Sequence, residues 1–310
     1  MRRAAVAGSL AAAAISLSAC AQAPSASHAQ APSASHVAAE APAPTQTTTP
    51  AGASTPAPPA GTSTPPDAPT DAPQSVPAAT PVPPLSGTLR VNLYGDSIGW
   101  ETEDALAADL AATGRATLKR EVFPGTAVCD WLSYMRRDLA NSPPQAAVLI
   151  FRGVNYTPCV RGPGGQRLTG VALADRFEAD TRTAVGLLTS AGVHVYLVRA
   201  PVARNDDMPA LVGDRFARVA QSMPGATYVD AGAIDEGPDR TFVAALPCLP
   251  TETCTRTDAD GAPVTVVRSP DGSHFCPVVP PPWVKCPVYS PGAIRFAAEV
   301  FEAIRQTQLG

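Results

Sequence analysis

The sequence lacks several features that would point to common classes of protein. Its 23 lysines and arginines are outnumbered by 27 aspartates and glutamates, and no basic patch predicts a nucleic-acid partner. The apolar run near the N-terminus, residues 4–17, is too short to span a bilayer comfortably. The seven cysteines include no Cys-x-x-Cys pair, and only two of the four histidines lie beyond residue 86. We therefore expect neither a metal site nor a cofactor.

Large apolar residues are almost absent from residues 21–86, which consist mainly of alanine, proline, threonine and serine. Such a segment cannot bury enough surface to offset the entropy lost on ordering, so we expect a disordered linker. From residue 87 onward the composition is that of a globular protein. The length of 87–310 suits one well-cored α/β domain.

Residues 1–20 have the features of an export signal. Two arginines precede the apolar run, which ends in Leu-Ser-Ala-Cys at 17–20 and resembles the lipobox of bacterial lipoproteins. The resemblance implies that Cys20 carries lipid and becomes the first residue, with two or more acyl chains holding it to the membrane. The alternative is an ordinary secretory signal cleaved near Ala19. In both cases we expect export, and with the lipid we expect the extracytoplasmic face of the cell membrane.

The remaining six cysteines all lie in the predicted folded domain. An even number in an exported domain favours disulfides, although six cysteines allow fifteen pairings. Short spacing suggests two local bonds, and the cysteines left over form the third. We therefore expect the pairs Cys248–Cys254, Cys276–Cys286 and Cys129–Cys159.

Strand and helix patterns alternate along residues 87–310. This alternation predicts a parallel, doubly wound sheet of about five strands with helices on both faces. Residues 231–268 are irregular, with a hairpin held by Cys248 and Cys254. Trp100 is expected in the core. We expect strands at 89–94, 116–123, 146–151, 193–198 and 226–229, and helices at 102–113, from Asp130 onward, and at 172–190, 209–221 and 291–306.

Residues with useful chemistry follow the predicted strands. Ser97 lies in the turn after the first strand, Gly125 after the second and Asn155 after the third. Asp271 and His274 come shortly before the last helix. Because the active site of such a sheet lies at the carboxyl ends of its strands, we expect these residues to form one site. Together they are a complete set for acyl transfer.

Each of these residues has a role in that chemistry. Ser97 is the expected nucleophile, and His274 is the base that takes its proton. Asp271 is placed to accept from Nδ1–H of His274 and fix the tautomer. The backbone N–H groups of Ser97 and Gly125 and the side-chain amide of Asn155 are the expected oxyanion donors. The domain's other histidine lies inside a predicted strand, where a structural role is expected.

Four short motifs, in order, resemble the blocks of the SGNH (GDSL) hydrolase family. They are Gly-Asp-Ser-Ile at 95–98, Gly125, Gly-Val-Asn at 153–155 and Asp-Gly-Ser-His at 271–274. The resemblance covers the whole predicted domain and implies a flavodoxin-like three-layer α/β/α sandwich and ester hydrolysis through an acyl-serine. Tyr156 stands where the family usually has aspartate, so the preceding asparagine must be held differently.

The residues around Ser97 also match Gly-x-Ser-x-Gly, the nucleophile elbow of α/β-hydrolases. We reject that fold because only one strand precedes this serine. In addition, Asp271 and His274 are three residues apart rather than on separate loops. Asp96 suits local capping of the turn better than catalysis.

Two of the cysteines follow the predicted oxyanion donors at the same distance in sequence. Cys129 comes four residues after Gly125, and Cys159 comes four residues after Asn155. A bond between these cysteines is therefore expected to tie the two donor loops together. The loop 276–286 is either a rigid surface loop or a wall of the substrate cleft, with Trp283 offering an apolar or sugar-stacking face.

We favour a serine esterase that removes a short, acetyl-type acyl group from a small-molecule or carbohydrate ester, the latter in the cell envelope. An O-acyltransferase would use the same acyl-serine with a sugar hydroxyl in place of water, and the sequence does not separate the two. A non-catalytic envelope-binding module would have a broken triad, whereas this one is intact. A lipase for long acyl chains would need a large apolar cleft, and no lid-like apolar helix is present. We expect a monomer.

Overall fold

The computed structural model describes residues 87–254 and 256–310, so the expected signal, Cys20 and the linker lie outside the described residues. Five parallel strands form the main sheet in the order β2-β1-β3-β4-β5, which is the flavodoxin-like order. The expected five-stranded parallel sheet is thereby confirmed. The strands are β1 (Leu89–Gly95), β2 (Ala116–Val122), β3 (Ala146–Phe151), β4 (His194–Arg199) and β5 (Ala226–Val229).

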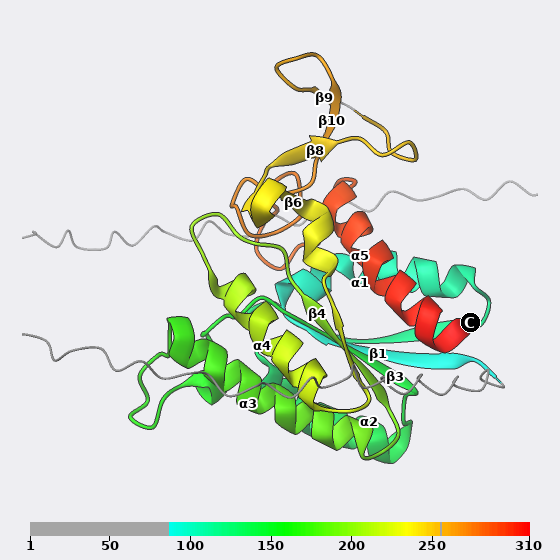
Figure 1. The fold of residues 1–310 in the computed structure, drawn as a ribbon, viewed down its shortest axis with the longest axis vertical. Coiled ribbons are helices and arrows are strands. Elements are labelled where there is room, and N and C mark those ends of the chain that lie inside the picture. Colours follow the sequence, from blue (N-terminus) through cyan, green and yellow to red (C-terminus); the bar gives the residue numbers. More distant parts are fainter. Residues whose placement is uncertain (1–86, 255) are drawn as a thin grey trace, which may run out of the picture. The chain divides into compact units, whose positions relative to one another are not determined.

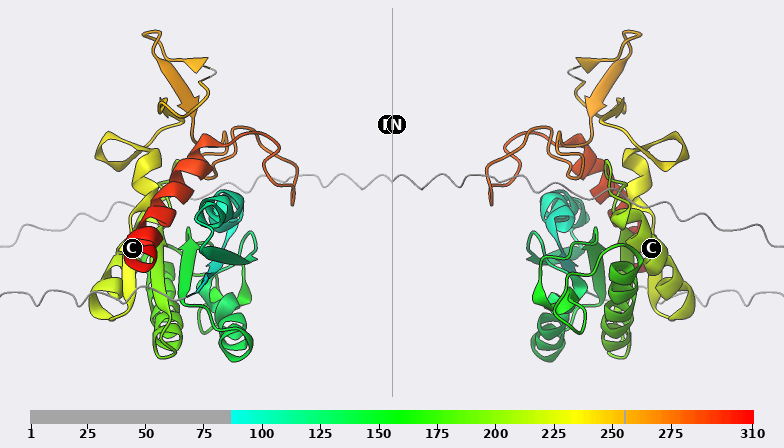
Figure 2. Two further views of the ribbon diagram at one scale, coloured as in Figure 1. Left: turned by 90° about the vertical axis from the view of Figure 1, so that its right-hand side faces the viewer. Right: turned by 90° about the vertical axis from the view of Figure 1, so that its left-hand side faces the viewer.

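Helices cover both faces of this sheet and make three layers (Figures 1 and 2). α1 (Ser97–Ala112) and α5 (Pro291–Ile304) pack on one face, where their apolar side chains share a core with β1 and β3. α2 (Val128–Asn141), α3 (Gly170–Thr189) and α4 (Met208–Ser222) share the second core on the opposite face. None of the described helices is both long enough and apolar enough to cross a bilayer.

The central strand β3 is buried along its whole length. Val148 and Ile150 belong to the core under α1 and α5, whereas Leu149 and Phe151 belong to the core under the other three helices. Both faces of the strand are therefore covered, which explains why it is a continuous apolar run rather than an alternating one.

Four helices begin earlier than their sequences predict, and for α1 and α2 the capping contacts give the reason. α1 starts at Ser97 rather than Thr102, because Asp96 caps it and accepts a hydrogen bond from the Ile98 N–H at 3.0 Å. α2 starts at Val128, so Asp130 is not its cap. Instead, Asp130 lies inside the first turn and accepts from the Ala127 N–H at 2.8 Å.

Residues 231–268 contain more regular structure than expected. A three-stranded antiparallel sheet has the order β8-β10-β9, and its hairpin joins β9 to β10. The Cys248–Cys254 disulfide closes the connection between β8 and β9, so it flanks the hairpin rather than holding it. The short elements are β6 (Glu236–Gly237), β7 (Thr241–Phe242), β8 (Ala245–Pro247), β9 (Arg256–Thr257), β10 (Pro263–Val266), η1 (Pro158–Val160), η2 (Ala231–Asp235), η3 (Pro238–Arg240) and η4 (Arg305–Leu309).

Candidate active site

Ser97 is the first residue of α1 and lies directly beyond the carboxyl end of β1. The turn that carries it is packed tightly between β3 and the helix. A Cβ atom at Gly95 would lie 2.9 Å from the Ile150 carbonyl oxygen and 3.2 Å from the Gly99 Cα. Glycine at position 95 therefore allows the strand, its neighbour and the helix start to approach closely and to fix the position of the serine.

Asp96 is fully buried beneath this turn and has two backbone donors. Its Oδ1 accepts from the Ile98 N–H at 3.0 Å, and its Oδ2 accepts from the Arg152 N–H at 2.8 Å. It thus caps α1 and also ties the turn to the residue that follows β3. Burial raises the pKa of Asp96 to about 6, although its backbone donors oppose this rise. The expected capping role is confirmed.

Ser97, His274 and Asp271 form a continuous hydrogen-bonded chain. Nε2 of His274 lies 2.8 Å from Oγ of Ser97, and its Nδ1 lies 2.7 Å from Oδ2 of Asp271. The second carboxylate oxygen of Asp271 accepts from the N–H groups of Ser273 and His274 at 2.7 and 3.1 Å. The turn at 271–274 therefore orients the aspartate, which in turn orients the imidazole.

The electrostatics of these three hydrogen-bonded residues favour a negatively charged aspartate and a basic histidine. Burial raises the pKa of Asp271, but hydrogen bonds from His274 and the neighbouring N–H groups outweigh it and hold that pKa well below its usual range. For His274, burial lowers the pKa, but the Asp271 bond and the charges of Glu101 and Asp271 raise it above its ordinary value. His274 is thus a stronger base than a free imidazole.

Glu101 is a site residue that the sequence interpretation missed. Its Oε2 accepts from the Phe275 N–H at 2.6 Å, directly beside His274. Burial raises the pKa of Glu101, while the charge of His274 and the Phe275 donor act in the opposite direction. Once α1 is known to start at Ser97, the i, i+4 spacing places Glu101 on the same face of the helix. The predicted helix began too late to reveal this spacing.

The next two predicted oxyanion donors are Gly125 and Asn155, which follow β2 and β3. Gly125 lies in the turn after β2 with φ +82°, and a Cβ atom there would lie 3.3 Å from Cδ2 of Tyr156. The Nδ2 of Asn155 donates to the Leu168 carbonyl at 2.8 Å, which is how this chain holds the asparagine. Within residues 87–254 and 256–310, no hydrogen bond joins Asn155 to Ser97, and Asn155 lines a separate hollow with Arg152.

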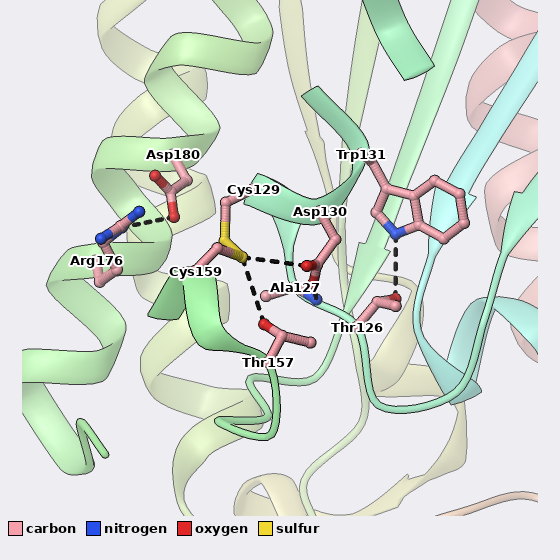
Figure 3. The surroundings of a disulfide bond; sticks show 9 residues. All are labelled: Thr126, Ala127, Cys129, Asp130, Trp131, Thr157, Cys159, Arg176 and Asp180. Atoms are coloured by element: carbon pink, nitrogen blue, oxygen red, sulfur yellow. Dashed lines mark hydrogen bonds and ion pairs between the residues drawn. A yellow bond between two sulfur atoms is a disulfide. The ribbon is translucent and has the colours of Figure 1, made fainter. Parts of the chain in front are cut away.

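The loops after β2 and β3 are joined covalently. The Cys129–Cys159 disulfide links the first turn of α2 to η1, as Figure 3 shows. All three disulfides expected from the cysteine spacing are present. Asp130 lies beside the Cys129–Cys159 bond, but both sulfur atoms are already used and do not form a metal site with it.

The second histidine of the domain does not belong to the site. His194 begins β4, and its Nε2 lies 2.9 Å from Oγ1 of Thr227 on the neighbouring strand. Burial lowers the pKa of His194. This is the structural role expected from its position within a strand.

A cavity of about 270 Å³ opens over Ser97. It is lined by the catalytic candidates and by the loop closed by Cys276 and Cys286. The loop is therefore a wall of the cavity, which was one of the two interpretations of its sequence. Trp100 was expected in the core but is only half-buried and lines this space. The lining residues are Ser97, Trp100, Glu101, Pro124, Ser269, Asp271, His274 and Val279 to Val284.

No family model and no curated protein match the chain. Among solved structures, it is similar to a lipase/acylhydrolase from Enterococcus faecalis, with 16% identity and a TM-score of 0.45 over 71% of this chain and 96% of that one. It is also similar to a variant of the acetylxylan esterase Axe2 from Geobacillus stearothermophilus, with 14% identity and a TM-score of 0.39 over 51% and 88% of the two chains. An acetyl xylan esterase, AlAXEase, matches with 18% identity and a TM-score of 0.36 over 50% and 91%. These likenesses are distant and do not by themselves assign an activity.

Proposed function

We propose that the protein is a serine esterase with Ser97, His274 and Asp271 as its catalytic triad. The observation that carries this proposal is the chain of two hydrogen bonds, 2.8 Å from Ser97 to His274 and 2.7 Å from His274 to Asp271. A serine at a helix start, beside a basic histidine and beneath a cavity, has the geometry that activates a hydroxyl for attack.

In the first half of the reaction, Oγ of Ser97 attacks the carbonyl carbon of the ester while its proton passes to Nε2 of His274. The bond to the leaving oxygen then breaks, and His274 returns the proton to that oxygen, releasing the alcohol. Asp271 stays ionised throughout and stabilises the imidazolium, which is why its low pKa suits the role.

The developing oxyanion requires donors that are fixed before the reaction. We propose the backbone N–H groups of Ser97 and Gly125 and the side-chain amide of Asn155. An asparagine amide carries two N–H donors, and the Leu168 carbonyl accepts from this nitrogen. The second N–H of Asn155 is the one we assign to the oxyanion.

In the second half, water attacks the acyl carbon, gives a proton to His274, and the acid leaves as Ser97 regains its proton. We propose a short acyl group on a cell-envelope carbohydrate as the substrate, with the protein tethered through Cys20 to the extracytoplasmic face of the cell membrane. If a sugar hydroxyl replaces water in this step, the same acyl-serine gives an O-acyltransferase.

The test is hydrolysis of p-nitrophenyl esters from acetate to octanoate by the full chain, with and without an added sugar acceptor. We expect turnover of the short esters, and a loss of at least about 10³-fold in kcat for Ser97→Ala. Acylated acceptor among the products would identify a transferase. Equal inertness of the wild type and Ser97→Ala on every ester would contradict the proposal.

A further inference from the structure

Exposed apolar side chains are concentrated in the loop that follows His274 and in the residues just after it. Within the described residues, six of the twelve large hydrophobic side chains that are exposed fall between positions 278 and 289. Six exposed apolar side chains within twelve residues are a concentration, not scattered surface hydrophobics, and such concentrations mark binding surfaces. The six are Val278, Val279, Trp283, Val284, Val288 and Tyr289.

Trp283 is the largest and most exposed of these side chains, at 69% exposure. Its ring stacks on Phe123 from the end of β2, with centroids 5.4 Å apart and planes 23° from parallel. Trp283 lines the cavity over Ser97, whereas Phe123 does not. Phe123 therefore supports the indole from outside the cavity, and the indole presents apolar surface to a molecule bound inside it.

The position of the loop indicates which half of an ester would meet Trp283. The loop begins just after His274, and its residues line the cavity together with His274 and Asp271. In ester cleavage the histidine delivers its proton to the leaving oxygen, so the alcohol half must lie beside Nε2. Trp283 lines the same cavity as His274, so we assign its wall to the alcohol half.

A second cavity of about 280 Å³ adjoins the first, because Trp100 and Glu101 line both. Its lining combines apolar surface from α1 and α5 with charged and hydroxyl groups. Lys285 is one of its lining residues and pairs with Glu103 at 2.5 Å and Asp104 at 2.7 Å. Tyr289 adds an exposed ring and a hydroxyl. A lining that combines apolar and polar groups suits a ligand that has both apolar faces and hydroxyl groups.

We propose that the Cys276–Cys286 loop binds the alcohol half of the substrate, and that this alcohol is a sugar chain of at least two rings. The C–H face of the esterified ring packs on Trp283 in the first cavity, and the next ring occupies the second cavity at Tyr289. This inference rests on the proposed esterase function and deepens it. Trp283 and Tyr289 are specificity-determining residues that take no part in the chemical steps.

The experiment compares three acetate esters that share an acyl group: ethyl acetate, acetylated methyl glucoside and acetylated cellotetraose. For Trp283→Ala we expect kcat/KM to fall about tenfold, equivalent to about 1.4 kcal/mol, on both sugar esters and to fall much less on ethyl acetate, whose ethyl group covers little of the indole. Trp283→Phe keeps an aromatic face and should retain most of the activity. Tyr289→Ala should lower kcat/KM about fivefold on the tetrasaccharide alone.

Two results would overturn the inference. One is an equal loss on ethyl acetate in Trp283→Ala, which would mean that the loop acts through His274. The other is a wild-type rate that rises with acyl length from acetate to octanoate and loses that rise in Trp283→Ala, which would assign the wall to the acyl chain.

Binding separates this inference from the proposed activity. With the Ser97→Ala variant, titration of unesterified cellotetraose should show binding that Trp283→Ala removes. Binding without ester turnover by the wild type would contradict the esterase and leave the sugar site standing. Turnover of ethyl acetate without any cellotetraose binding would leave the esterase standing and contradict the sugar site.

Discussion

Among single residues, Glu101 is the one outside the proposed triad whose charge acts on His274. Its carboxylate lies where it raises the pKa of His274, and its oxygen holds the Phe275 N–H. Only neutral His274 can take the serine proton, so activity should appear as pH rises through the pKa of His274. A raised pKa therefore shifts this acid limb to higher pH.

Replacing Glu101 with glutamine should reverse part of that shift. Glu101→Gln keeps an oxygen for the Phe275 N–H but removes the charge, so the pKa of His274 falls and the acid limb of kcat/KM moves to lower pH. Asp104→Asn is the matched control on the same helix, because its exposed carboxylate pairs with Lys285 and Arg120 instead. A pH profile that stays in place, or moves up, in Glu101→Gln would contradict this role.

Asp96 should matter for stability more than for chemistry. Asp96→Ala leaves the Ile98 and Arg152 N–H groups without their carboxylate acceptor in a buried turn. We expect a loss of about 2–4 kcal/mol in the free energy of unfolding, measured by urea denaturation. Asp207→Ala is the control, since Asp207 precedes α4 without a side-chain capping bond and should change stability by less than about 0.5 kcal/mol. Similar losses in both variants would contradict the capping account.

Among the elements, the Cys129–Cys159 disulfide should hold the donor loops in place. The bond closes a loop with a separation of 30 residues, so replacing both cysteines with serine should cost about 3–4 kcal/mol of stability by the loop-entropy estimate. We also expect kcat to fall, because Gly125 and Asn155 lie on the two loops that it joins. The measurements are urea denaturation and ester turnover.

The matched control for this disulfide is the Cys248–Cys254 pair. Its separation is only 6 residues, and it lies in the small antiparallel sheet region rather than beside the donor loops. The double serine variant of this pair should lose about 2 kcal/mol and keep its kcat. If kcat falls equally in both double variants, the Cys129–Cys159 bond has no special relation to the site.

The elements also show where sequence patterns stop being informative. The strands of the main sheet and the bodies of its helices follow from apolar periodicity. The start of α1 does not, because Ile98 and Gly99 are poor helix formers and only the buried Asp96 cap decides it. The strands within residues 231–268 span two to four residues, too few to display a period.

For the whole molecule, topology explains why the meeting of Ser97 and His274 could be predicted. Parallel strands deliver their carboxyl ends to one edge, so residues far apart in sequence were expected to meet there, and Ser97 and His274 do. The direction of the Asn155 side chain was not predictable in this way. It depends on the Leu168 carbonyl, a single contact with no periodic signal in the sequence.

The proposed membrane tether is also a property of the whole molecule. Cys20→Ser should move the protein from the membrane fraction to the soluble exported fraction, because the acyl chains that hold it would be lost. The measurement is detergent phase partitioning of the full chain, with the Cys248/Cys254 double serine variant as the control that keeps Cys20. Retention of Cys20→Ser in the detergent phase would contradict a lipid anchor at this residue.

The most direct test of the central claim is to trap the acyl group on Ser97. The full chain is mixed with excess p-nitrophenyl acetate, and the reaction is quenched in acid. The protein is then digested, and the mass of the peptide containing Ser97 is measured by mass spectrometry. We expect one added acetyl group on Ser97 in the wild type, and neither the acetyl group nor ester turnover in Ser97→Ala. Undiminished turnover in Ser97→Ala, or an acetyl group carried by a different residue during turnover, would contradict the account.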